Sequence, residues 1–437
     1  MNSFFLRLSR HIPNKLLVRL LYLYTCGIQP AFFRHPRLND KKLSKLSAFS
    51  EQTADRRLLV DVSHQVYTQI KSGIPRVVNK VSLALTELPQ NDFSFEFVML
   101  LNGELTTARR FTERILHLPK GYLGVDEKIV IREGDQMLIL DNVMDKYSDF
   151  LPYFDQVHRF RGKVATVMND MMPLQHPEWL PEAVVTVFLN ALPQVILKND
   201  VIFCVSRSTE EDLRHWGRKH MPAAFEKLRT IVFTQGADIG TPAFQATPLR
   251  EPLVRFIRQS QKEKAAIFTQ VSIIQPRKGQ DFALDAFETL WDQDENFRLV
   301  YVGRKGWKAE ALYQRIRSHP EMGKRFLFVE DASETELAAI FDASTALISP
   351  SRGEGYGLPV VEAALRKLPV LVSDIPIYHE VAGEGGIFFP LDDPGVLCDC
   401  VREVAHWTPE QRRARAAKVN VGTWEQGARD ILAGLLA

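Results

Sequence analysis

The sequence predicts an α/β protein made of two Rossmann-like domains, each with a doubly wound parallel sheet. Its 437 residues allow two ordinary domains, each able to bury its own core. Short apolar runs alternate with helical patterns along the chain, which is typical of parallel sheets covered by helices. A buried strand, a glycine loop and a helix follow one another in both halves, at residues 57–88 and 346–368.

Composition narrows the class of protein. A hydrophobic fraction of 45% and a charged fraction of 25% are those of a soluble globular protein. The formal net charge of +2 implies no general affinity for nucleic acid. The cysteines lack the spacing of a zinc site, and we expect reduced thiols in a cytosolic protein. They are Cys26, Cys204, Cys398 and Cys400.

Residues 1–50 form a basic amphipathic segment. The first 37 residues contain six Arg or Lys residues and no acidic residue. Apolar side chains recur at helical intervals over residues 4–24, but Arg19 interrupts the best apolar run, which is too short to span a bilayer. A secretory signal fits less well, because Tyr24 to Cys26 is a poor cleavage site. The pattern favours a helix on an anionic membrane surface, and a helix packed on the protein itself or on a partner is the alternative.

The first domain is expected over residues 57–245. A strand at residues 58–62 leads through a polar loop to Gly73, and a helix follows from Pro75. Such a loop lies at the carboxyl edge of the sheet, where ligands bind, although many α/β domains begin in this way. Further strands are expected at residues 95–101, 136–140, 163–168, 200–206 and 230–240. Ser206 is expected to cap the next helix.

The second domain is expected over residues 255–415, and a final helix at residues 420–437. A strand at residues 265–271 precedes Arg277 and Lys278, which stand just before a helical pattern. Cations at a helix start oppose the helix dipole, so a ligand phosphate would resolve the conflict; a solvated pair of loop charges is the alternative. Two more strands begin at Phe297 and Phe326.

The segment 345–381 carries the most informative pattern. An apolar run at residues 346–348 is followed by a loop with three glycines, and Pro359 then opens a helix. Glycines allow close backbone approach, and the free N–H groups of a helix start favour phosphate. Glu354 and Glu362 lie in this loop and helix, eight residues apart. By themselves, two Glu residues at this spacing are common in helical proteins.

This segment resembles a known family. The strings SRGEGYGLPVVEA and PVLVSDIPIYHEVAG are similar to the donor-binding half of the retaining glycosyltransferases of family 4, which have the two-domain GT-B fold. The resemblance covers about residues 58–430 and is strongest from 269 to 390. It implies that the two domains face each other across a cleft, and that the final helix packs back near the domain junction.

The resemblance also implies roles for individual residues. Glu354 and Asp170 are expected to be catalytic, with Asp170 orienting the acceptor hydroxyl or accepting its proton. An Asp after a strand is also a common turn or helix-cap residue, and that is the alternative for Asp170. Glu362 is expected to bridge two ribose hydroxyls, and Lys278 with Arg277 to contact phosphate. The full set of expected donor-binding residues is Arg277, Lys278, Gly355, Tyr356, Gly357, Leu358, Glu362, Gly73, Ser272, Gly303 and Val329.

Two positions depart from the family pattern. Asn169 precedes Asp170 where related enzymes often have His, so the acceptor side loses one titratable group. Ser272 stands where some members use another Arg, which leaves part of the phosphate clamp missing or replaced. No Asp-x-Asp motif lies on a suitable loop, so we expect neither a metal nor any other cofactor besides the nucleotide sugar.

The expected function is therefore the retaining transfer of a hexose, preferably mannose, from a nucleotide diphosphate sugar. The acceptor would be a polysaccharide or a polyprenyl-linked glycan at the cytoplasmic face of the membrane, with residues 1–37 contacting anionic lipid. Two alternatives remain open: another GT-B enzyme, such as a sugar-nucleotide epimerase, or a catalytically silent subunit that binds nucleotide sugar.

Overall fold

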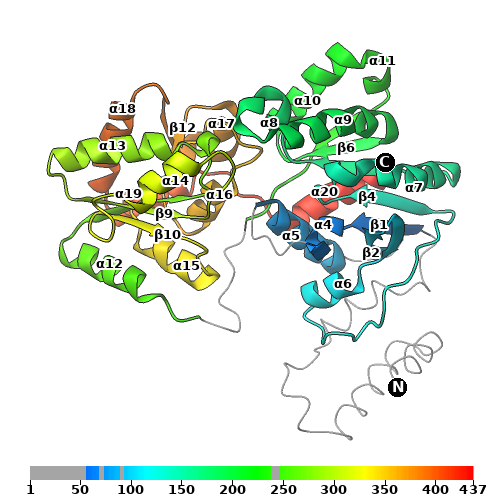
Figure 1. The fold of residues 1–437 in the computed structure, drawn as a ribbon, viewed down its shortest axis with the longest axis horizontal. Coiled ribbons are helices and arrows are strands. Elements are labelled where there is room, and N and C mark those ends of the chain that lie inside the picture. Colours follow the sequence, from blue (N-terminus) through cyan, green and yellow to red (C-terminus); the bar gives the residue numbers. More distant parts are fainter. Residues whose placement is uncertain (1–55, 68–72, 89–92, 238–246, 437) are drawn as a thin grey trace, which may run out of the picture.

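The protein consists of two α/β lobes whose carboxyl sheet edges face each other (Figure 1). The computed structural model describes residues 56–67, 73–88, 93–237 and 247–436. The expected amphipathic segment at residues 1–50 lies outside these described residues. Within them, no helix is both long enough and apolar enough to cross a membrane.

The N-terminal lobe contains a seven-stranded sheet in the order β3-β2-β1-β4-β5-β6-β7. All neighbouring strands are parallel except β3, which is antiparallel to β2 at the edge. The chain reverses its direction of winding between β1 and β4, so the crevice for a ligand lies at the carboxyl ends of these strands. The strands are β1 (Arg56–Asp61), β2 (Phe93–Leu101), β3 (Glu104–Thr107), β4 (Asp135–Ile139), β5 (Val164–Met168), β6 (Val201–Cys204) and β7 (Arg229–Val232).

Helices cover both faces of this sheet. On one face α5 and α6 bury apolar side chains, and on the other α7, α9, α10 and α11 do so. The helices are α4 (Ser63–Tyr67), α5 (Gly73–Glu87), α6 (Arg109–Ile115), η1 (Met144–Lys146), α7 (Tyr147–Arg159), α8 (Met172–Gln175), η2 (Pro177–Trp179), α9 (Glu182–Lys198), α10 (Arg207–His220) and α11 (Pro222–Phe225).

The C-terminal lobe repeats the same winding with a six-stranded, fully parallel sheet in the order β10-β9-β8-β11-β12-β13. Its crevice lies between β8 and β11, and both of these strands lead into loops with expected site residues. The strands are β8 (Ala266–Val271), β9 (Phe297–Val302), β10 (Phe326–Val329), β11 (Ala346–Ser349), β12 (Val370–Ser373) and β13 (Gly386–Phe389).

Two layers of helices enclose this second sheet. Side chains of α13, α14 and α18 form one core, and those of α12 and α15 form a smaller one on the opposite face. The helices are α12 (Glu251–Lys262), η3 (Pro276–Lys278), α13 (Gln280–Asp292), α14 (Glu310–Arg317), α15 (Glu334–Ala343), α16 (Leu358–Leu365), α17 (Pro376–Ala382), η4 (Gly383–Gly385), α18 (Pro394–Ala405) and α19 (Pro409–Ala416).

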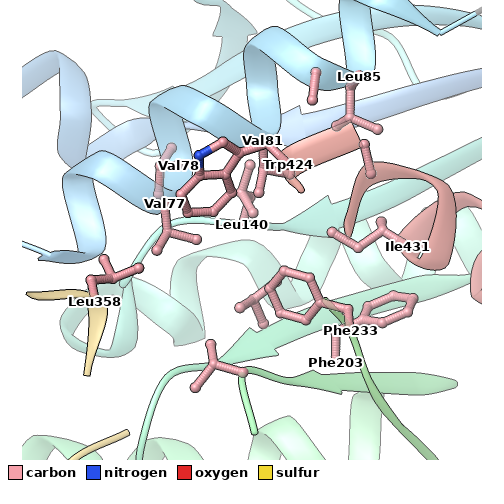
Figure 2. Packing of buried hydrophobic residues seen from close by; sticks show 14 of the residues in the cluster. Val77, Val78, Val81, Leu85, Leu140, Phe203, Phe233, Leu358, Trp424 and Ile431 are labelled. Atoms are coloured by element: carbon pink, nitrogen blue, oxygen red, sulfur yellow. The ribbon is translucent and has the colours of Figure 1, made fainter. Parts of the chain in front are cut away.

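The last helix, α20 (Trp424–Leu436), returns to the N-terminal lobe and packs against α5 (Figures 1 and 2). Glycines allow the close approach: a Cβ at Gly427 would lie 2.2 Å from the Thr234 carbonyl oxygen. Asp430 accepts a hydrogen bond from the Thr234 amide at 2.9 Å. Leu358 of α16 lies at the edge of the same apolar cluster, so this core also joins the two lobes (Figure 2).

The doubly wound fold confirms the prediction from the strand and loop pattern, but several strand boundaries were wrong. The strand expected at residues 200–206 ends at Cys204, because Ser206 takes the extended conformation of a helix cap. The strands β3 and β13 were not predicted at all. Each has only four residues and lies at or next to a sheet edge, where apolar periodicity is weak.

Candidate functional site

The loop between β11 and α16 faces the N-terminal lobe. Gly357 caps α16 with a φ of 99°, a left-handed conformation that favours glycine, and the Tyr378 ring closes the space beside it. Pro359 follows in the first turn of α16, where its missing N–H costs nothing. The segment 355–358 therefore presents backbone amides at the beginning of a helix, as the glycine pattern predicts.

Glu354 lies at the centre of this loop. Its Oε1 atom accepts hydrogen bonds from the Lys278 ammonium and from Ser351 Oγ, the latter at 2.7 Å. Its Oε2 atom lies 3.3 Å from Arg277 Nη1. The side chain is only 10% exposed, so this carboxylate depends on its two cationic neighbours for neutralisation.

Charge and burial shift the pKa values of this cluster. Burial by itself would raise the pKa of Glu354, but the charges of Lys278 and Arg277 outweigh it and lower the pKa to about 2. Burial and the nearby Arg277 guanidinium lower the pKa of Lys278 to about 8, although Glu354 opposes the change. The cluster therefore combines an anion that is hard to protonate with a lysine that loses its proton more readily than an ordinary lysine.

Arg277 and Lys278 lie in the short helix η3, and Gly279 separates them from α13. Glu354 is an internal anion that offsets this basic pair beside the helix start. Arg277 also donates to the Gly353 carbonyl at 3.0 Å. These contacts join the β8 and β11 loops at the crevice of the second sheet.

Asp170 and Asn169 lie in the facing lobe, at the carboxyl end of β5. An added Cβ at Gly355 would lie 2.0 Å from the Asn169 carbonyl oxygen, so a side chain at position 355 would prevent this approach of the two lobes. Asp170 Oδ1 accepts a hydrogen bond from the Met172 amide at 3.1 Å, which fixes its carboxylate at the start of α8. Burial raises the pKa of Asp170, against the attraction of Arg277 and Lys278.

Ser206 ties the same loop to the N-terminal lobe. It is the N-cap of α10, as expected, and its hydroxyl also donates to the Gly355 carbonyl at 2.7 Å. Glu380 of α17 accepts from the Arg207 amide at 2.9 Å and from the Ser208 amide at 3.2 Å. The sequence carried no signal for Glu380, because its partners are more than 170 residues away.

Glu362 of α16 contacts the N-terminal lobe directly. It is 3% exposed and forms an ion pair with Arg76 of α5, in the facing lobe. Arg76 contacts Oε1 of this carboxylate, and the contact of Glu362 with ribose stays a prediction. Arg76 was not singled out from the sequence. A signal was present, because Arg76 is a basic residue at a helix start, just after Gly73 and Pro75, like the basic pair at residues 277–278 before a helix of the second lobe.

The remaining expected residues line the loops around this centre. Gly73 begins α5, where an added Cβ would lie 3.7 Å from Leu358. Ser272 Oγ accepts from Gln280 at 2.8 Å, and a Cβ at Gly303 would clash with the Ser272 carbonyl at 1.9 Å. Val329 is buried at the end of β10.

Tyr356 completes the glycine loop. It is partly buried, and burial together with the charge of Glu380 raises the pKa of its hydroxyl to about 12. In the described part of the chain, no cluster of three or more His, Cys, Asp and Glu residues is arranged to hold a metal ion.

The sequence is similar to a known protein family and to known proteins. Residues 255–418, which contain the β8 and β11 loops, match the family described as Glycosyl transferases group 1. The second lobe is a glycosyltransferase group 1 domain. The serotype-specific mannosyltransferase WbdA of Escherichia coli is 30% identical over 385 residues, covering 87% of this chain and 46% of WbdA. The O-antigen chain mannosyltransferase RfbU of Salmonella typhimurium is 32% identical over 132 residues, covering 30% of this chain and 36% of RfbU.

The chain thus spans about half the length of the WbdA relatives that it matches. Solved structures support the fold. Anabaena HepE, in complex with UDP and glucose, aligns with a TM-score of 0.57 at 14% identity, covering 87% of this chain and 99% of HepE. The trehalose-6-phosphate synthase OtsA aligns with a TM-score of 0.58 at 13% identity, covering 87% of this chain and 99% of OtsA. The fold is GT-B, which confirms the expectation from the glycine loop.

Proposed function

We propose that this chain is a retaining glycosyltransferase that moves a hexose, preferably mannose, from a nucleotide diphosphate sugar to a cell-surface glycan acceptor. The carrying observation is the convergence of Arg277, Lys278 and the start of α16 on Glu354 at the cleft. The similarity to WbdA and RfbU, both named as mannosyltransferases, supports the choice of sugar.

The donor diphosphate would bind where the positive charges gather. Departure of the nucleotide leaves negative charge on the β-phosphate, and fixed cations and helix amides stabilise such charge without reorganising. Arg277 and Lys278 supply the cations, and the amides of residues 355–358 supply the dipoles. In the free protein Glu354 neutralises both cations, so the incoming diphosphate would replace it and leave Glu354 available to the sugar hydroxyls.

These cations can perform the work that a divalent metal performs in other transferases, and we propose a reaction without metal or further cofactor. Glu362 would accept hydrogen bonds from the ribose hydroxyls, and Val329 at the end of β10 would lie beside the base. Ser272, after β8, and Gly303, after β9, would lie beside the bound nucleotide at the carboxyl edge of the second sheet.

The acceptor would approach from the N-terminal lobe, where Asp170 faces the donor loop. The raised pKa of Asp170 improves its ability to take a proton from the attacking hydroxyl near neutral pH. We propose attack on the face from which the phosphate leaves, with retention of anomeric configuration. Asn169 lies close to Gly355, so the acceptor-side loop is next to the donor-side loop. This proximity supports the proposed attack, because the two reactants must be held close together.

The acceptor is proposed to be a polysaccharide or a polyprenyl-linked glycan at the inner face of the cytoplasmic membrane. The basic residues among positions 1–37 support contact with anionic lipid. The O-antigen function in the name of RfbU supports a surface polysaccharide as the product class.

Calorimetric titration with UDP, GDP and their hexose conjugates tests the donor side. We expect one nucleotide and its sugar to bind to the wild-type protein, and the Lys278→Ala variant to bind both more weakly. Glu226→Gln, a change at an exposed residue far from the described contacts, is the control. Absence of binding by every nucleotide sugar would contradict the proposal.

Product analysis then separates the enzyme classes. Transfer to a glycan acceptor with retention, alongside slow donor hydrolysis in its absence, is the expected result. Conversion of the nucleotide sugar to an epimer without acceptor would indicate an epimerase, and tight donor binding without any turnover would indicate a silent subunit.

A further inference from the structure

Arg76 belongs to the opposite lobe but reaches a residue of the donor-side lobe. It lies in the first turn of α5, and its Nη1 atom contacts Oε1 of Glu362 in α16. The two residues are 286 positions apart in the chain. The Arg76 side chain is 38% exposed, whereas that of Glu362 is 4% exposed, so the pair lies at the margin between the cleft and the buried junction.

The position of Arg76 is unfavourable unless an anion faces it. A cation in the first turn of a helix lies beside the positive end of the helix dipole, and α5 has no acidic residue in that turn to offset it. Glu362 has the reverse problem, because a buried carboxylate needs a charged or hydrogen-bonded partner. The contact between the two residues thus offsets both conflicts.

Apolar packing lies beside the buried Glu362 end of the pair. Leu358 of α16 belongs to the same buried cluster as Val77, the residue that follows Arg76 (Figure 2). Charge-assisted hydrogen bonds are stronger and more directional in such surroundings than at an exposed surface. The Arg76 contact therefore limits the rotation of the Glu362 carboxylate.

We propose that Arg76 is a positioning residue that holds Glu362 in the orientation that receives the donor ribose. This inference rests on the proposed function. The contact with Arg76 uses Oε1 and leaves Oε2 of Glu362 to accept from a ribose hydroxyl. Because Arg76 comes from the facing lobe, ribose recognition becomes complete only in the closed cleft.

The closed arrangement has supports that are independent of Arg76. Ser206 donates to the Gly355 carbonyl, and Glu380 receives two amides at the start of α10. These contacts join the start of α10 to the loop before α16 and to α17, and they do not involve α5. Replacement of Arg76 should therefore loosen Glu362 without separating the lobes, which makes the residue accessible to a specific test.

The test compares ribose with 2′-deoxyribose. Wild-type protein, Arg76→Gln and Arg76→Lys are titrated by calorimetry with UDP and GDP and with the 2′-deoxy form of each. The wild-type protein should prefer the ribonucleotide by roughly 10-fold to 100-fold, the value of one charge-assisted hydrogen bond. Arg76→Gln should bind the ribonucleotide more weakly and lose most of this preference, and Arg76→Lys should keep part of it.

Three further variants make the result decisive. Arg110→Gln removes an exposed arginine from the first turn of α6, away from the cleft, and should keep the full preference. Glu362→Gln should lose the preference, and addition of Arg76→Gln to it should cause little further loss, because both changes remove the same interaction.

The outcomes distinguish this inference from the proposed function. If the wild-type protein shows no preference, or if Glu362→Gln retains it, the assignment of Glu362 to the ribose fails. If Glu362→Gln loses the preference and Arg76→Gln retains it, only the role of Arg76 is overturned. Tighter ribonucleotide binding by Arg76→Gln would also overturn it, because Arg76 would then compete with the ligand.

Discussion

Replacement of Glu354 by Gln should destabilise the free protein, because it leaves two cations facing each other without their anion. The cluster lowers the pKa of Glu354 from its ordinary value of 4.5 to about 2. At 1.36 kcal/mol per pKa unit, the charged form gains about 3 kcal/mol from the folded surroundings. Gln has the shape of Glu without its charge, so Glu354→Gln should lose about that amount at pH 7.

Differential scanning calorimetry can measure the loss. For a cooperative unit of 150–250 residues, 1 kcal/mol corresponds to roughly 2–4 °C, so we expect a decrease of roughly 6–12 °C in the Tm of the lobe that contains Glu354. Glu226→Gln removes an exposed carboxylate of the same type and should leave Tm nearly unchanged. Inorganic diphosphate should raise the Tm of Glu354→Gln more than that of the wild-type protein, because it supplies the missing negative charge.

The pH dependence gives an independent check. The folded pKa of Glu354 lies below the unfolded one, so its contribution is complete above about pH 4.5 and disappears as the pH falls towards 2. Above pH 8 Lys278 becomes neutral and the contribution shrinks again. The difference between wild-type and variant should therefore be largest between about pH 5 and 8. An equal Tm for Glu354→Gln and the wild-type protein in this range would refute the reasoning.

Three other predictions follow from the structure and the sequence. Burial and the nearby Asp141 carboxylate raise the pKa of Asp61 from 3.8 to about 8, so this group stabilises the fold fully below about pH 4 and loses its contribution as the pH rises through 8. Asp61→Asn should flatten the decrease of Tm over this range, and a parallel decrease in both proteins would contradict the pKa shift. Gly427→Ala should cost about 1–3 kcal/mol in urea unfolding, because the methyl group would collide with the β7 side of the junction, whereas Ala433→Ser on the exposed side of α20 should cost little. Deletion of residues 1–45 should release the protein from vesicles that contain anionic lipid. Unchanged binding in a sedimentation assay would contradict the proposed membrane contact.

The fold was predictable because both lobes carry strong local patterns. Long apolar strands such as β9 and the glycine loop before α16 are recognisable without any knowledge of their surroundings. Short edge strands were missed because four residues give too little periodicity. The ends of β6 and β7 were misjudged because the residues after them lie in caps and loops with strand-like composition.

Candidate site residues could be named from the sequence only where a local pattern marks them. The pattern around Glu354 and Glu362 is local, and Arg277 and Lys278 were found because cations at a helix start are unusual. Their mutual neutralisation was not predictable, since it depends on the distance between two loops that are 76 residues apart. The partners of Glu362 and Gly355 come from the other lobe, and the sequence gives no measure of how two lobes approach.

The return of α20 to the first lobe has a consequence for synthesis of the chain. Asp430 and its partner Thr234 are separated by 196 residues, and the whole second lobe lies between them. A ribosome therefore completes the glycosyltransferase domain before it delivers the helix that covers α5 of the first lobe. We expect the first lobe to expose apolar surface during this interval, and the second lobe to be the first stable folded unit.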